Sequence, residues 1–66
     1  MNRFFAKNVT AEQAKALCLL CGVFVTFHDN GDVSFLGLEM GISICHSMLK
    51  DREGCEPTEI DEGYTE

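Results

Sequence analysis

Four cysteines and two histidines are the side chains of this 66-residue chain most suited to chemistry. Cys18-Leu19-Leu20-Cys21-Gly22 has the Cys-x-x-Cys-Gly spacing typical of a zinc knuckle, and Cys45, His46 and Cys55 are candidates to complete a tetrahedral site. The competing interpretation is that the cysteines are small buried residues, because free cysteine packs as a modest hydrophobe. The pair closes a predicted helix and the chain has no second Cys-x-x-Cys pair. We therefore expect no metal, and keep a small zinc-stabilised domain as the alternative.

The remaining patterns do not indicate an enzyme. A thioredoxin-like redox pair opens a helix, whereas this pair closes one. Cys45 and His46 are adjacent, and adjacent side chains on a helix point about 100° apart, so they cannot act as nucleophile and base. Asp29-Asn30-Gly31-Asp32 lacks the rest of a calcium loop, and no glycine-rich phosphate loop is present. We expect no catalytic residue and no cofactor.

The charge of the chain is acidic and unevenly placed. The net charge is −6, and five of the eleven acidic residues lie in 55–66, which holds no lysine or arginine. Phosphate backbones are bound by clusters of basic residues, and this chain has none, so direct binding of nucleic acid is not expected. A partner with a basic protein surface is the better electrostatic match.

The apolar run over 16–27 is too short to cross a membrane, which takes about 20 apolar residues. The residues after it, Thr26 to Asp29, lack the small-residue pattern of a signal-peptide cleavage site. We therefore expect no membrane association. The expected location is the cytoplasm, where thiols stay reduced.

A helix is predicted over 10–21. Thr10 and Gln13 have the spacing of a capping box, and Gly22 is suited to the left-handed residue that ends a helix. One face of this helix is expected to meet the core, and its members recur at helical spacing: Ala14, Leu17, Cys18 and Cys21.

A β-hairpin is predicted over 23–36. A two-residue turn would place Asp29 opposite Asp32 and separate the apolar residues of the two strands. A three-residue loop, Asp29-Asn30-Gly31, pairs His28 with Asp32 instead. This register collects one set of side chains on the core face: Val23, Val25, Phe27, Val33 and Phe35. The other face then carries Phe24, Thr26, His28, Asp32, Ser34 and Leu36.

The pattern of residues 38–53 favours a helix over a strand. Apolar and polar residues partly alternate over 42–48, so a strand remains the alternative for this segment. The pattern of 1–9 does not decide between a strand and an arm. The predicted fold is therefore a small α+β domain over 1–54 with an α-β-β-α order and one central hairpin. Residues 55–66, acidic and poor in apolar side chains, are expected to form a flexible tail.

These observations favour a small, acidic, non-enzymatic protein-binding module. It would inhibit or adapt a larger protein, of a kind that includes nucleic-acid-binding proteins with basic surfaces. In size and charge alone, the chain is similar to accessory proteins of bacteriophages and mobile elements. A homodimeric structural or regulatory protein is a further alternative. The candidate partner-binding residues are two apolar side chains outside the core and six acids: Phe24, Leu36, Asp29, Asp32, Glu56, Glu59, Asp61 and Glu62.

Overall fold

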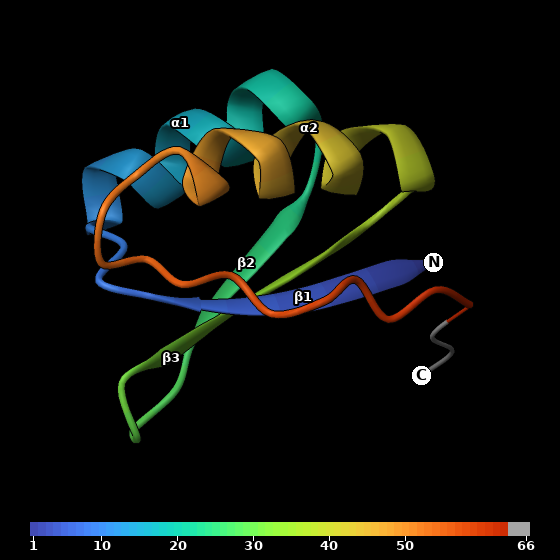
Figure 1. Ribbon diagram of the computed structural model, residues 1–66. Coiled ribbons are helices and arrows are strands. Elements are labelled where there is room, and N and C mark those ends of the chain that lie inside the picture. Colours follow the sequence, from blue (N-terminus) through green and yellow to red (C-terminus); the bar gives the residue numbers. More distant parts are fainter. Residues whose placement is uncertain (64–66) are drawn as a thin grey trace.

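The computed structural model describes residues 1–63, which form two helices and three strands (Figure 1). In chain order these are β1 (Asn2–Lys7), α1 (Ala11–Cys21), β2 (Phe24–Phe27), β3 (Asp32–Gly37) and α2 (Glu39–Lys50). The α+β class is confirmed, but the order is β-α-β-β-α rather than α-β-β-α. The additional strand is the N-terminal segment, whose side chains alternate between the core and the opposite face of the sheet. No helix among the described residues is long and apolar enough to cross a membrane.

The three strands form one antiparallel sheet in the order β1-β3-β2. Both helices lie on one face of this sheet, and the other face is uncovered (Figure 1). α1 packs on β2 and α2, while α2 packs on β1 and β3. The core lies between the two layers, where the rings of Phe4 and Phe35 stack with centroids 4.8 Å apart. Both of these side chains are fully buried.

The structure confirms the predicted helix over 10–21. Thr10 Oγ1 accepts a hydrogen bond from the Gln13 amide, and Gln13 Oε1 accepts one from the Thr10 amide, both at 3.1 Å. Gly22 ends the helix at a φ of 67°. The expected core face is only partly correct, because Ala14 and Leu17 are buried but Cys18 is exposed. α1 contacts only β2 and α2, so its buried face is narrow.

The hairpin has the predicted register and loop. The His28 amide donates to the Asp32 carbonyl at 2.9 Å, and Gly31 adopts a φ of 93°. Val25 lies opposite Phe35, and Phe27 opposite Val33, so the four side chains share one face. The expected burial is wrong for Phe27, which is 52% exposed. The hairpin loop projects away from the two helices (Figure 1), and Phe27 is the last residue of β2 before this loop.

The segment over 38–53 contains a helix, α2, as expected. Its buried residues are Ile42, Cys45 and Leu49. Gly41 lies where α2 passes the end of α1, and a Cβ at this position would overlap the carbonyl oxygen of Cys21. A residue other than glycine at position 41 would therefore push the two helices apart.

The described part of the acidic segment, which was expected to be a flexible tail, lies along the sheet. Residues 55–61 run beside β1 (Figure 1), and their backbone groups bond to Arg3, Phe5 and Lys7. The shortest of these bonds are 2.7 Å long. The edge of β1 offers unpaired donors and acceptors, and they hold the tail despite its acidic composition. Cys55 also packs into the core. Residues 64–66 of the expected tail lie outside the described residues.

Candidate protein-binding face

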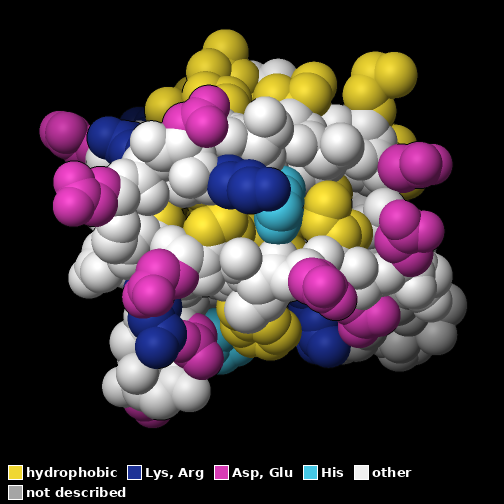
Figure 2. Space-filling view, in the orientation of Figure 1, with side chains coloured by type: hydrophobic (Ala, Val, Ile, Leu, Met, Phe, Trp, Pro, Cys, Tyr) yellow, Lys and Arg dark blue, Asp and Glu magenta, His cyan; other side chains and the backbone are white. Residues whose placement is uncertain are grey.

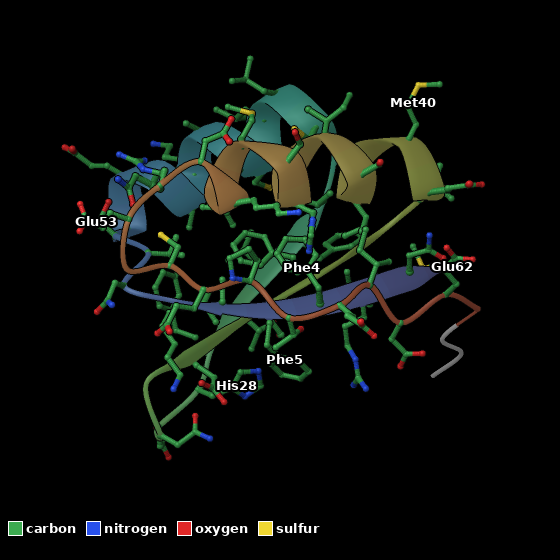
Figure 3. All side chains as sticks on the ribbon, in the orientation of Figure 1. Phe4, Phe5, His28, Met40, Glu53 and Glu62 are labelled. Carbon is green, nitrogen blue, oxygen red and sulfur yellow. The ribbon has the colours of Figure 1, made fainter. Side chains whose placement is uncertain are left out.

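The uncovered side of the sheet is a regular array of nine side chains, which we call the outer face. The strand register sets them in three rows across β1, β3 and β2: Arg3–Leu36–Phe24, Phe5–Ser34–Thr26 and Lys7–Asp32–His28, the last completed by the backbone hydrogen bond from His28, just after β2, to Asp32. Phe5 and His28 project from the side of the sheet opposite the helices, whereas Phe4 projects between the layers (Figure 3). The strand alternation therefore separates a core side from an uncovered outer side.

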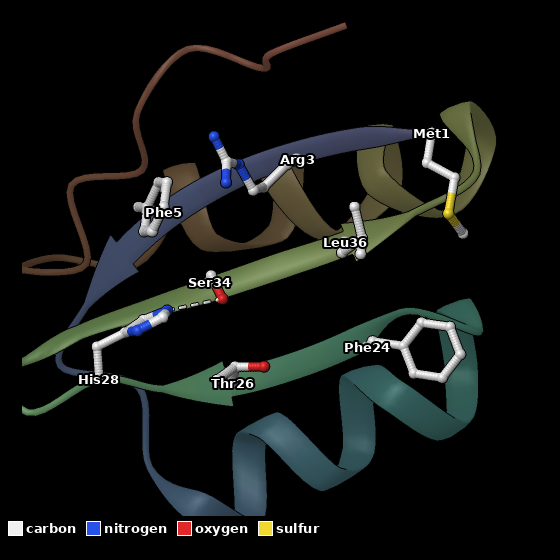
Figure 4. A pocket seen from close by; sticks show the side chains of 8 residues that line it. All are labelled: Met1, Arg3, Phe5, Phe24, Thr26, His28, Ser34 and Leu36. Carbon is white, nitrogen blue, oxygen red and sulfur yellow. Dashed lines mark hydrogen bonds between the residues drawn. The ribbon is translucent and has the colours of Figure 1, made fainter. Parts of the chain in front are cut away.

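A shallow hollow of about 500 Å³ lies on the outer face (Figure 4). Its apolar end is formed by Phe24 and Leu36, which are directly opposite each other on β2 and β3, with Met1 beside them. Phe24 is 65% exposed and Met1 49% exposed. The structure thus brings together the two apolar residues selected from the sequence, and adds Met1 and Phe5, which the sequence analysis did not select.

The polar end of the hollow holds an imidazole–hydroxyl pair. His28 Nε2 lies 2.9 Å from Ser34 Oγ, and the His28 ring lies 5.8 Å from that of Phe5 (Figure 4). Asp32 is opposite His28 in the register, as expected, but the imidazole bonds to Ser34 on the diagonal. The imidazole and the hydroxyl can each donate or accept a hydrogen bond, so the pair is suited to holding a polar ligand group.

Arg3 places a positive charge on the outer face and an acidic residue of the tail balances it. Its guanidinium lies 5.1 Å from the centroid of the Phe5 ring, and an ion pair at 3.5 Å joins it to Asp61. The arginine stem and the Phe5 ring together extend the apolar surface toward β1. The charge of Arg3 therefore does not make this side of the sheet a basic surface.

Acidic side chains border the outer face on two sides. Asp29 is exposed in the hairpin loop, and Asp32 begins β3 next to it. On the β1 side, Glu56 lines a second shallow hollow with Phe5 and Lys7, and Asp61 meets Arg3. Glu59 and Glu62 are exposed on the same segment. The six acids selected from the sequence thus lie in two groups, at the hairpin end and along the β1 edge.

The cysteines and histidine of the zinc alternative do not form one site. Cys55 is buried with its sulfur 3.9 Å from the Asn8 carbonyl oxygen, and His46 Nε2 lies 2.8 Å from the carbonyl of Thr58. Cys45 is buried beside Cys21, and Cys18 is exposed. Burial, with the hydrogen bond to Cys21 as a second cause, raises the pKa of the Cys45 thiol to about 12. Within residues 1–63 no group of three or more potential ligands is placed to hold a metal.

A second exposed apolar surface lies on the outside of the helices, and we call it the helix surface. Figure 2 shows it as hydrophobic side chains along the upper side of the molecule. Its members are Leu19 and Leu20 of α1 with Met40, Ile44 and Met48 of α2, and they are 45 to 76% exposed. The last three recur every four residues, so they form one stripe along α2.

The chain was compared with known protein families, curated proteins and solved structures, and none of them matches it.

Proposed function

We propose that this chain is a small, acidic, non-enzymatic protein-binding module that inhibits or adapts a larger protein, and that the outer face is its binding surface. The observation that carries the proposal is a hollow apolar surface, left uncovered by the helices, with acidic side chains along two of its borders. Protein interfaces commonly combine an apolar centre with a polar rim.

The apolar centre supplies affinity in this proposal. Phe24 is the most exposed aromatic side chain on the outer face, and it lies directly against Leu36. Full burial of such a side chain contributes about 1.5–3 kcal/mol, and interface energy concentrates on a few central anchors. Phe24 and Leu36 are the proposed anchors, and the His28–Ser34 pair offers hydrogen bonds beside them.

The acidic border supplies orientation and partner choice. A partner with lysine and arginine around an apolar patch would complement the acids at the hairpin end and along the tail. Proteins that bind nucleic acids carry such basic surfaces, so one of them is the proposed target. A direct nucleic-acid surface would need a basic groove, whereas Arg3 is paired with Asp61 and Lys7 lies opposite Asp32. The proposed setting is the cytoplasm, in the role of a phage or mobile-element accessory protein.

The test is affinity capture from a lysate of the source cells, with three variants compared at equal loading. Phe24→Ser and Leu36→Ser are expected to lose at least tenfold of a specifically captured protein, because each removes an anchor. Met40→Ser is the matched control, since Met40 is exposed on the helix surface. Capture should weaken as salt rises, because the acidic border is exposed. Equal capture by all variants, or capture that Met40→Ser abolishes, would contradict the assignment of the outer face.

A further inference from the structure

The tail covers one edge of the sheet, at β1, and leaves the other edge, at β2, open among the described residues. Along β1, the tail accepts hydrogen bonds from the amides of Arg3, Phe5 and Lys7 and donates to the carbonyls of Arg3 and Phe5. β2 pairs with β3 alone, so its other side is open among the described residues. An open edge is a template for another strand.

The backbone groups on the open side belong to Val25 and Phe27. His28 donates to Asp32, and hydrogen-bonded and non-hydrogen-bonded pairs alternate in an antiparallel ladder. The amides and carbonyls of Phe24, Thr26 and His28 therefore face β3, while those of Val25 and Phe27 face outward. The strand Phe24–Phe27 contains no charged residue and no proline, the usual features that protect an edge.

We propose that a second copy of this chain pairs with this edge, β2 against β2, antiparallel about a two-fold axis through Thr26. Val25 of each copy then lies opposite Phe27 of the other, and each pair exchanges both backbone hydrogen bonds. The two sheets become one continuous sheet with all helices on one side. The outer faces of both copies join on the other side, where Phe24 lies opposite His28 of the second copy.

The sequence of the edge is complementary to itself in this register. The cross-strand pairs are Val25 with Phe27, Thr26 with Thr26 and Phe24 with His28, so no acid faces an acid. Pairing would cover Phe27, the side chain on the core side of the sheet that the helices leave 52% exposed. Centring the axis on Val25 instead would engage Val23, which is fully buried, and Gly22, which caps α1. The Thr26-centred register uses only the accessible part of the strand.

The distribution of charge also favours a second copy at this edge. Two chains of net charge −6 repel each other, but the acidic tail lies beside β1, at the opposite edge of the sheet from β2. The remaining acids near the junction are those of the hairpin, Asp29 and Asp32. Joining at β2 therefore keeps the two tails as far apart as the sheet permits. This inference rests on the backbone groups of the strand edge and not on the proposed function, although Phe24 and His28, which line the hollow, would face the second copy at the junction.

Sedimentation equilibrium across a wide concentration range tests the pairing. The chain is expected to be a dimer at micromolar concentration, and Phe27→Pro is expected to weaken the dimer at least tenfold. Proline removes an outward-facing donor and is tolerated on an edge strand in the monomer. Circular dichroism checks that this variant is folded, and Met40→Ser, altered on the helix surface, should dimerise normally. A wild-type monomer at high micromolar concentration would overturn the proposal, as would a folded Phe27→Pro that still dimerises.

A cross-link tests the register without relying on that variant. Thr26→Cys, made in a Cys18→Ser background, places two thiols opposite each other at the two-fold axis, within the reach of a disulfide. Oxidised glutathione accepts the two electrons, and two thiols become one disulfide as two glutathione thiols form. We expect a covalent dimer from Thr26→Cys and none from Cys18→Ser alone. Failure of Thr26→Cys to cross-link under conditions where the chain dimerises would overturn the proposed register.

Discussion

Phe4 and Phe27 provide the sharpest contrast for a stability measurement, because only Phe4 is enclosed by the fold. Its side chain is 1% exposed, stacks on Phe35 and meets the His46 ring edge-on at a centroid distance of 5.1 Å. Truncating a buried phenylalanine to alanine costs about 3–5 kcal/mol. For a chain of this length the whole stability is about 3–10 kcal/mol. Phe4→Ala is therefore expected to remove from about a third to all of the free energy of unfolding.

Phe27→Ala is the matched substitution on the same sheet face. Phe27 is 52% exposed, and the helices do not cover the hairpin end, so its truncation should cost about 1 kcal/mol in the monomer. Urea unfolding followed by circular dichroism, at a concentration where the chain is monomeric, measures both. A urea midpoint that falls further for Phe27→Ala than for Phe4→Ala would refute this account of the core.

Three smaller tests address the thiols and the tail. Burial raises the pKa of the Cys45 thiol to about 12, above its value in the unfolded chain. The protonated thiol therefore stabilises the fold fully below about pH 9, and this stabilisation declines as the pH rises toward 12. The free energy of unfolding should fall by up to about 1.4 kcal/mol per pH unit between those values, and less steeply in Cys45→Ala. With a thiol reagent in native protein, Cys18 should react first and Cys45 and Cys55 last; fast reaction of Cys55 would show that the tail is not seated. Thr58→Val should speed amide exchange at Phe5 and cost about 1 kcal/mol, because Thr58 Oγ1 accepts the Phe5 amide at 3.0 Å; unchanged exchange at Phe5 would contradict that bond.

Local features of the chain explain why part of the fold could be predicted. The Thr10–Gln13 box and Gly22 define the ends of α1 through short-range hydrogen bonds. The loop over 29–31 was predictable because only one loop length places Val33 and Phe35 on the same face as the apolar residues of β2. The ends of α1 and the length of the hairpin loop each depend on residues that are close together in the sequence, so they can be predicted from it.

Features that depend on distant contacts were missed. The adjacent Phe4 and Phe5 obscured the alternation of β1, whose partner β3 lies far along the chain. The alternation of Asn2, Phe4 and Ala6 was the available signal, and it would also have placed Phe5 on the outer face. Pairing of the tail depends on backbone groups of β1 and leaves little trace in side-chain composition. The exposure of Phe27 follows from how far the helices extend, which no local pattern records.

Site-specific photo-crosslinking most directly tests the claim that the outer face binds a protein partner. A benzophenone side chain replacing Leu36 would sit in the hollow on the central strand, one strand away from the open edge of β2. The same group replacing Met40 on the helix surface is the control. The account predicts an adduct with a second, distinct protein in source cells from position 36 and not from position 40. The same adduct from both positions, or adducts at position 36 only with the chain itself, would contradict it.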